Sequence, residues 1–212
     1  MYIPAAFRED DAEKLFDLIE QHGFGLLISD FDGTPFATHL PLLLDRAVAP
    51  HGCLIGHMAR ANPHWEKADG KTVLAVFAGP HAYVSPTWYE AENVVPTWNY
   101  VAVHAYGTFR AIHEREALLK IVGQCVHFYE AALPSPWTFD GRNEYAQRMA
   151  GAIVGFRIEI SRLEGKWKLN QNHPRERREK VIRALRASGD ETSRAVADLM
   201  QHQLAEEAGR PS

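Results

Sequence analysis

The spacing of apolar residues changes from helical to alternating early in the chain. Apolar residues recur three and four positions apart over 12–19, which predicts an amphipathic helix that ends at Gly23. A short apolar run follows at 24–29, and the turn pair Asp32-Gly33 connects it to residues 36–45. We expect these two segments to form a β-hairpin.

The same two patterns continue along the rest of the chain. Strands are expected at 53–58, 71–78, 97–112, 153–161 and 166–170. The strand at 71–78 is apolar on both faces and is expected to be fully buried, and Glu164-Gly165 is expected to turn the chain into the last strand. Helices are expected at 62–67, 114–132, 144–149, 175–187 and 193–206.

This order of elements favours a mainly β protein with flanking helices (α+β), built on an antiparallel barrel. The strands follow one another with few helices and no βαβ rhythm, which argues against a doubly wound sheet. The sequence contains no GxGxxG, Walker lysine, GxSxG or HExxH motif. We expect residues 1–172 to form the barrel domain, and 173–212 to form a helical extension packed on it.

Composition limits the class of protein. The 212 residues are 46% hydrophobic and 24% charged, which is ordinary for a globular protein. No apolar run reaches the roughly 18 residues that a membrane span needs, and the N-terminus does not resemble a signal peptide. The two cysteines, Cys53 and Cys125, are expected to be free and buried. We therefore expect a cytoplasmic protein with no membrane partner.

The net charge of −4 is unevenly distributed. Residues 166–186 carry eight cations and two anions, a net charge of +6, which leaves −10 for the rest of the chain. Such a basic segment is compatible with phosphate binding along a nucleic acid. More often, a run of this kind is a solvated helix face or meets an acidic partner.

Histidine is abundant, with eleven residues. His39, His57, His64 and His104 lie on different expected elements and have no companion carboxylate at metal-ligand spacing. We therefore expect no metal site and interpret these histidines as hydrogen-bonding residues of the core or of a pocket.

Four clusters set a Trp or Tyr beside compact polar residues. They are residues 56–65, 85–89, 96–100 and 166–174. Aromatic walls with a few polar groups are typical of a small-molecule site, here one for a flat, hydrogen-bonding, phosphorylated ligand. The alternative is that these residues cover the mouth of a barrel.

Five segments of the chain resemble one known family. Thr38-His39-Leu40-Pro41, the stretch from Gly56 to Pro63, Val84–Tyr89, Val95–Tyr100 and Lys168-Leu169-Asn170-Gln171-Asn172 are similar, in order, to the PaiB-type proteins, which are described as FMN-binding negative transcriptional regulators. The resemblance runs to about Leu204. It implies a split β-barrel related to pyridoxine-phosphate oxidases, and a homodimer with two FMN sites at the subunit interface.

Within that resemblance, physical chemistry suggests a role for each candidate cofactor-binding residue. Arg60 supplies the charge for the phosphate, beside a helix capped by Asn62. His57, Met58 and Ala59 offer backbone groups and a wall, and the amides of Thr38, His39 and Leu40 meet the pyrimidine edge. Trp98 and Asn99, from the other subunit, supply a stacking face and an amide, while Lys168 and Gln171 reach the ring.

Three functions stay open at this point. The first is an FMN-binding regulator of transcription, the second an FMN-dependent oxidoreductase acting on an unidentified small molecule, and the third a module that sequesters FMN or haem. The helix expected at 193–206 carries a single Lys or Arg, Arg194, so the sequence provides weak support for DNA as a partner. No catalytic residue is identified.

Overall fold

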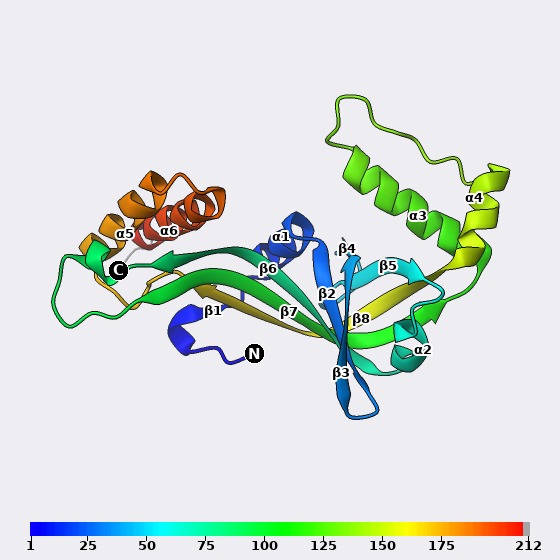
Figure 1. Ribbon diagram of the computed structural model, residues 1–212, viewed down its shortest axis with the longest axis horizontal. Helices are drawn as coiled ribbons and strands as arrows, with labels where there is room; N and C mark the ends of the chain where they lie inside the picture. The colour runs from blue at the N-terminus through cyan, green and yellow to red at the C-terminus, as the bar shows by residue number, and fades with distance from the viewer. Residues whose placement is uncertain (210–212) are drawn as a thin grey trace. The chain divides into compact units, whose positions relative to one another are not determined.

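The computed structural model describes residues 1–209 (Figure 1); residues 210–212, the end of the expected extension, lie outside the described residues. The strands are β1 Arg8–Glu9, β2 Phe24–Phe31, β3 Thr34–Pro41, β4 Leu43–Asp45, β5 Cys53–Ala59, β6 Thr72–Val84, β7 Thr97–Ile112 and β8 Ile153–Lys168. The α-helices are α1 Ala12–Gln21, α2 His64–Ala68, α3 Arg115–Glu130, α4 Glu144–Met149, α5 Arg175–Ala187 and α6 Glu191–Gly209. Short 3-10 helices are η1 Ala5–Phe7, η2 Pro86–Tyr89 and η3 Ala150–Ala152.

The sheet order explains why the structure is a barrel. The described strands follow the order β3-β2-β6-β7-β8-β5-β4, and β1 pairs with the end of β8. The two strands at opposite ends of this order, β3 and β4, are consecutive in the chain and separated only by Leu42. One residue spans less than about 4 Å, so the two edges of the sheet must meet. Because β3 and β5 touch there without joining the ladder, the fold is the expected antiparallel split barrel.

The chain divides into two compact units, which we call the helical unit and the barrel unit. The barrel unit comprises residues 12–77 and 104–163; the helical unit comprises residues 1–11, 78–103 and 164–209. The long strands β6, β7 and β8 contribute to both units. The expected domain boundary between residues 172 and 173 stays a prediction.

In the barrel unit, side chains alternate between the interior and the outer face of the sheet. Val73, Ala75 and Phe77 on β6 are buried in the interior, whereas Leu74 and Val76 are only half-buried. The expectation that both faces of this segment are fully buried is therefore wrong. Leu74 lines a shallow surface groove of about 290 Å³.

Helix α3 covers another part of the outer face and requires a glycine beneath it. A Cβ atom on Gly155 of β8 would lie 2.8 Å from Leu118 and 2.9 Å from Ile121 of α3. Cys125 lies on the same buried helix face, as expected, and burial raises the pKa of its thiol. Close packing of α3 onto β8 thus depends on the absence of a side chain at residue 155.

Two strand boundaries differ from the prediction. The segment 36–45 is not one strand, because the chain crosses at Leu42 from one edge of the sheet to the other. Conversely, β8 continues through Glu164-Gly165, where a turn was expected. The pairing of β1 with β8, which aligns Glu9 with Gly165, holds this stretch extended.

In the helical unit, α5 and α6 pack side by side (Figure 1). Their contact face is apolar and includes Val181, Leu185, Val196 and Met200, all fully buried. The turn expected at Ser188-Gly189-Asp190 is present: Gly189 has a φ of +77°, and the Asp190 carboxylate accepts a hydrogen bond of 2.8 Å from the N–H of Ser193.

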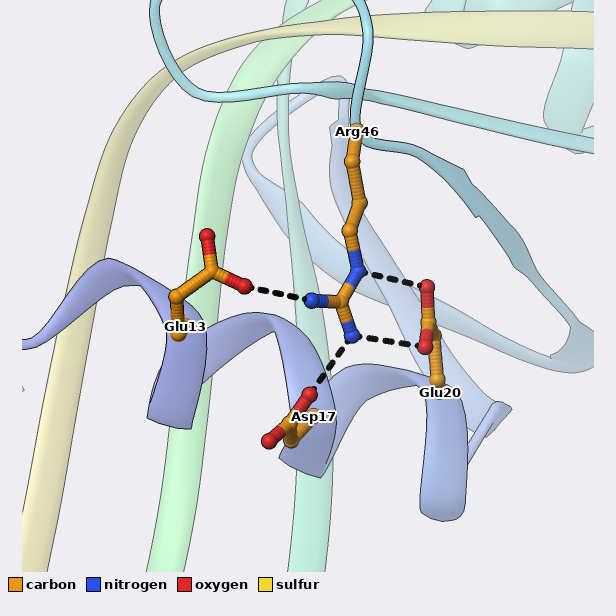
Figure 2. Close-up of polar contacts among 4 residues, drawn as sticks. All are labelled: Glu13, Asp17, Glu20 and Arg46. Atoms are coloured by element: carbon orange, nitrogen blue, oxygen red, sulfur yellow. Dashed lines mark hydrogen bonds and ion pairs between the residues drawn. The ribbon is translucent and has the colours of Figure 1, made fainter.

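Arg46 attaches the loop after β4 to helix α1 of the barrel unit (Figure 2). Its guanidinium donates to both carboxylate oxygens of Glu20, at 2.8 and 2.7 Å, to Asp17 at 2.7 Å and to Glu13 at 2.8 Å. Hydrogen bonds to Glu20 and Asp17 raise the pKa of Arg46. A two-pronged contact of this kind fixes geometry that a lysine ammonium does not reproduce.

We expect Arg46→Met to lower the free energy of unfolding by about 1 kcal/mol, because the network is partly exposed and screened by water. Denaturant titration at low and at 1 M salt is the measurement, and the loss should shrink at high salt. Arg142→Met is the matched control, since Arg142 is almost fully exposed beside Asp140. A loss of equal size at both salt concentrations would contradict the electrostatic explanation.

Candidate functional site

The loop after β5 is a compact turn held by hydrogen bonds of its own residues. The N–H of Asn62 donates to the carbonyl of Ala59 at 2.9 Å, and the Asn62 side chain accepts from the N–H of His64 at 3.0 Å. The N-cap of α2 is Pro63, so the prediction that Asn62 is the cap is wrong by one residue, although the Asn62 side chain still satisfies the N–H of His64. The Trp65 indole donates to the Arg60 carbonyl at 3.0 Å and closes the turn.

Arg60 connects this loop to η3. Its Nε donates to the carbonyl of Gly151 and its Nη2 to the carbonyl of Ile153, both at 2.8 Å. The Arg60 backbone N–H donates to the carbonyl of Ala152, also at 2.8 Å. The guanidinium is exposed, and Nη1 is its nitrogen without a hydrogen-bond partner in the described chain. Arg60 thus fixes two segments and keeps part of its donor capacity for a ligand.

His64 lies at the centre of a buried hydrogen-bond network that the sequence analysis did not assign to the site. Its Nε2 is 2.9 Å from the Ser29 hydroxyl, and its Nδ1 is 2.8 Å from the Thr38 hydroxyl. Asn62 donates from its side-chain amide to the same Thr38 hydroxyl at 3.2 Å. The network connects β2, β3 and α2 behind the Arg60 loop. The sequence feature that could have indicated this role is the position of His64 within the cluster of residues 56–65.

The surroundings of His64 favour the neutral imidazole. The residue is fully buried, and the rings of Phe31 and Phe36 meet it edge-on at centroid distances of 5.5 and 5.1 Å. Burial lowers the pKa of His64 to about 4. At neutral pH the ring therefore acts as an uncharged bridge between two hydroxyl groups.

The three predicted site residues on β3 do not lie on one face of the strand. Thr38 contacts His64, whereas His39 stacks on Phe24 of β2 at 6.1 Å, and Leu40 is buried. All three residues belong to an edge strand of the sheet. In the described structure β3 pairs only with β2, so alternate N–H and C=O groups along its other edge are free of ladder bonds.

On β5, Met58 is buried and His57 and Ala59 lie on the opposite face. The Nδ1 atom of His57 is buried and has no hydrogen-bond partner within residues 1–209. Burial also lowers the pKa of this imidazole. A buried ring nitrogen without a partner is rare in a finished core and marks a position where a ligand group can bind.

The other four predicted residues belong to the helical unit. Lys168 donates to the Trp98 carbonyl at 2.9 Å and to the Thr97 hydroxyl, so the structure brings Lys168 and Trp98 together. Asn99 faces the opposite way, fully buried, and its amide donates to the Met200 sulfur at 3.4 Å. Gln171 bonds its own loop, accepting from the N–H of Leu169 and donating to the Trp167 carbonyl.

The described residues contain neither a metal-binding cluster nor a membrane-spanning helix. No group of three or more His, Cys, Asp or Glu side chains there is arranged to hold a metal ion. No helix within residues 1–209 is long and apolar enough to cross a membrane.

We expect protonation of His64 to destabilise the fold below pH 6.5. The folded pKa of about 4 lies below the unfolded value of 6.5, so the unfolded chain binds the proton first as the pH falls. This group alone lowers the free energy of unfolding by up to about 1.4 kcal/mol per pH unit between these values. Denaturant titrations from pH 7 to 4 on the wild type and on His64→Gln measure the difference.

His202→Gln, which replaces an exposed histidine, is the control. It should keep the wild-type dependence of the free energy of unfolding on pH. His22, His57 and His173 also have lowered pKa values, which is why the comparison uses the difference between slopes. An unchanged slope in His64→Gln would show that His64 is not the group that titrates.

Comparison with known proteins identifies the family. The family model described as "Putative FMN-binding domain" matches residues 1–162. The protease synthase and sporulation protein PAI 2 of Bacillus subtilis (strain 168) is 34% identical over 206 residues, covering 96% of this chain and 98% of that protein. An uncharacterized protein of Emericella nidulans is 28% identical over 242 residues, covering 95% and 96%.

Solved structures support the fold. The flavocytochrome Anf3 from Azotobacter vinelandii superposes with a TM-score of 0.60 at 12% identity, over 76% of this chain and 69% of that one. The FAD and heme binding protein from Mycobacterium smegmatis gives a TM-score of 0.60 at 14% identity, over 86% and 80%. At such identities the likeness establishes the fold alone. With the family match, however, the chain belongs to the PaiB-like family of FMN-binding proteins, and FMN is its cofactor.

Proposed function

We propose that the chain is a homodimeric, cytoplasmic FMN-binding protein that acts as a negative regulator of transcription. The observation that carries the proposal is the match of residues 1–162 to the FMN-binding family, together with 34% identity to the sporulation protein of B. subtilis over nearly the whole of both chains. We take the word sporulation in the name of that relative as support for a regulatory role.

The residues around the β5 loop fit an FMN phosphate and the edge of its ring. The exposed Arg60 guanidinium offers charge and Nη1, and the buried Nδ1 of His57 lacks a partner in the described structure. The unpaired edge of β3, at Thr38 to Leu40, offers backbone amides to a heterocycle. When bound, FMN supplies the redox chemistry itself, whereas Arg60, Asn62 and Thr38 would bind and orient it.

In this proposal Trp98 and Asn99 serve the flavin of the partner subunit, and Lys168 and Gln171 reach the ring. The 53% exposure of Trp98 and the hydrogen bond from Lys168 to the Trp98 carbonyl support these roles. Asn99 and Gln171 would have to exchange their present intramolecular hydrogen bonds for contacts with the flavin.

The ion pairs of α5 argue against a simple DNA-binding role for the basic segment. Its cations are largely matched by carboxylates, in the pairs Arg175–Glu179, Arg178–Glu207, Lys180–Glu90 and Arg186–Asp198. A phosphate backbone would have to compete with these pairs. We therefore propose that any DNA contact is weak and salt-sensitive, or is made through another protein.

Arg60→Met should weaken FMN binding far more than riboflavin binding, because only FMN carries the phosphate. Loss of a charge-assisted contact costs roughly 1.5–3 kcal/mol, about 10- to 150-fold in affinity. Since Arg60 also holds η3, riboflavin affinity reports the structural part of the change, and the FMN-to-riboflavin ratio isolates the phosphate. Flavin fluorescence titration measures both.

Arg157→Met, which removes an exposed arginine of the same unit, is the control for charge. It should leave the FMN-to-riboflavin ratio at the wild-type value. If Arg60→Met weakened both ligands equally, Arg60 would be a structural residue and the phosphate would bind elsewhere.

Regulator and oxidoreductase differ in how the bound flavin reacts with a reduced nicotinamide. We expect slow or negligible reduction when the FMN complex is mixed with NADH or NADPH in a stopped-flow instrument, because the sequence contains no GxGxxG or other Gly-rich nucleotide motif. Rapid bleaching of the flavin band that saturates with nucleotide concentration would favour the oxidoreductase and count against the regulator.

A further inference from the structure

The segment between α3 and α4 folds back along α3 and forms a pocket with it, within the barrel unit (Figure 1). The pocket has a volume of about 500 Å³ and contains none of the residues assigned to the flavin. One wall is a stripe of α3 whose members are spaced three and four positions apart. These members are Gly123, Val126, His127 and Glu130. The opposite wall is the segment 136–139. Small-molecule pockets have volumes of roughly 300–1,000 Å³, so this one is large enough for a ligand.

Glu130 and Trp137 connect the two walls at the end of α3. The backbone N–H of Trp137 donates to Oε2 of Glu130 at 2.7 Å, so the carboxylate lies beside the residue that carries the indole. The ring centroids of Trp137 and Phe139 are 6.2 Å apart at an interplanar angle of 56°. Trp137 is 60% exposed, which leaves its ring accessible to a ligand. One carboxylate and two aromatic rings therefore line the same open pocket.

Gly123 leaves space in the α3 wall. Glycine destabilises the interior of a helix relative to alanine, so its presence there needs a local cause. Crowding is not that cause: a Cβ atom on Gly123 would lie 3.5 Å from Phe139, which is an ordinary van der Waals distance, in contrast to the close contacts at Gly155. A longer side chain at residue 123 would extend toward Phe139 and fill the pocket. The glycine is therefore explained by the space that it keeps open.

The carboxylate of Glu130 determines which charge the pocket accepts. A carboxylate can accept about four hydrogen bonds, and Glu130 accepts one, from Trp137. No cation in residues 1–209 forms an ion pair with it. Among the described residues that line the pocket, Glu130 is the only carboxylate, and none is a Lys or Arg. A carboxylate attracts an ammonium group by its charge, and the face of an indole attracts the same group through its π electrons.

We propose that this pocket binds an organic ammonium compound, a molecule with one primary amine on a planar apolar body. The ammonium group donates to Glu130, and the body packs against the rings of Trp137 and Phe139 in the space beside Gly123. The proposal goes beyond the proposed function, because none of these residues is assigned to the flavin.

The test uses 2-naphthylmethylamine as the probe and 2-naphthylmethanol as its neutral counterpart. Each compound is titrated calorimetrically into the full chain, with and without saturating FMN. We expect the amine to bind at least about tenfold more tightly than the alcohol, because only the amine makes a charged hydrogen bond with Glu130. Saturation with FMN should leave this ratio unchanged.

Glu130→Gln tests the charge of the site. The variant keeps a side-chain oxygen that can accept from the Trp137 N–H, so the segment stays in place. It should lower the affinity for the amine about tenfold and leave the affinity for the alcohol unchanged. Glu116→Gln is the matched control, because Glu116 is an exposed carboxylate of the same helix. It should leave both affinities at their wild-type values.

Gly123→Leu tests the pocket itself, because the new side chain occupies the space of the ligand. Both probes should lose at least about tenfold in affinity, whereas FMN should bind as it does to the wild type. Leucine is a better helix former than glycine, so the variant should melt no lower than the wild type. Gln124→Leu is the matched control: it adds the same side chain at an exposed neighbouring position that does not line the pocket. If Gly123→Leu did not fold, the Glu130→Gln comparison would decide.

Three results would overturn the proposal. They are equal affinities of the wild type for the amine and the alcohol, unchanged amine binding in Glu130→Gln or in folded Gly123→Leu, and displacement of FMN by the amine, which would place the probe in the flavin site. Failure of FMN to bind while the amine binds as expected would contradict the proposed function and leave the amine site in place.

Discussion

The single residue between β3 and β4 is the constraint on which the barrel depends. Leu42 crosses from one edge of the sheet order to the other, and its surroundings leave it little freedom. Its N–H donates to the Gly23 carbonyl at 2.8 Å, and its side chain is almost fully buried. Cβ atoms on Gly23 and Gly25 would lie 3.1 and 3.2 Å from Leu42 atoms, so bare glycine backbone makes room for the crossing. A longer link would allow the two edges to separate.

The same crossing creates the candidate cofactor site. Because β3 ends the ladder, its outer edge keeps unpaired backbone groups, and the His64 network holds this strand against the loop that carries Arg60. A neutral imidazole suits this position, since it bridges hydroxyl groups without placing a second positive charge beside the Arg60 guanidinium. Fold and site are thus coupled: the hydrogen bonds that hold β3 to β2 and α2 also orient the loop.

The sequence predicted elements well where the physical signal is local. A short apolar run located β2, alternation located the first part of β8, and residues of known turn chemistry located the turn at Gly189. Contacts between residues that are distant in the chain could not be predicted from the sequence. The break at Leu42 follows from the crossing between the two edges of the sheet, and the continuation of β8 past Gly165 depends on its pairing with β1. The same limit applies to the site. The resemblance selected the 56–65 box, but the role of His64 depends on Ser29 and Thr38, which are remote in sequence.

The cations of residues 166–186 are less available to a polyanion than the composition of this segment suggests. The basic run after residue 166 suggests one cationic surface. Three of the five arginines of α5, Arg175, Arg178 and Arg186, nevertheless pair with carboxylates of α5 and α6, and these pairs stabilise the two helices. Lys166 and Lys168 of the same segment donate to neutral oxygens of Tyr2, Thr97 and Trp98 instead. A nucleic-acid backbone would have to compete with these ion pairs for the guanidinium groups, and salt would weaken that competition further. The pairing of α5 with α6 therefore counts against a continuous phosphate-binding face on these two helices.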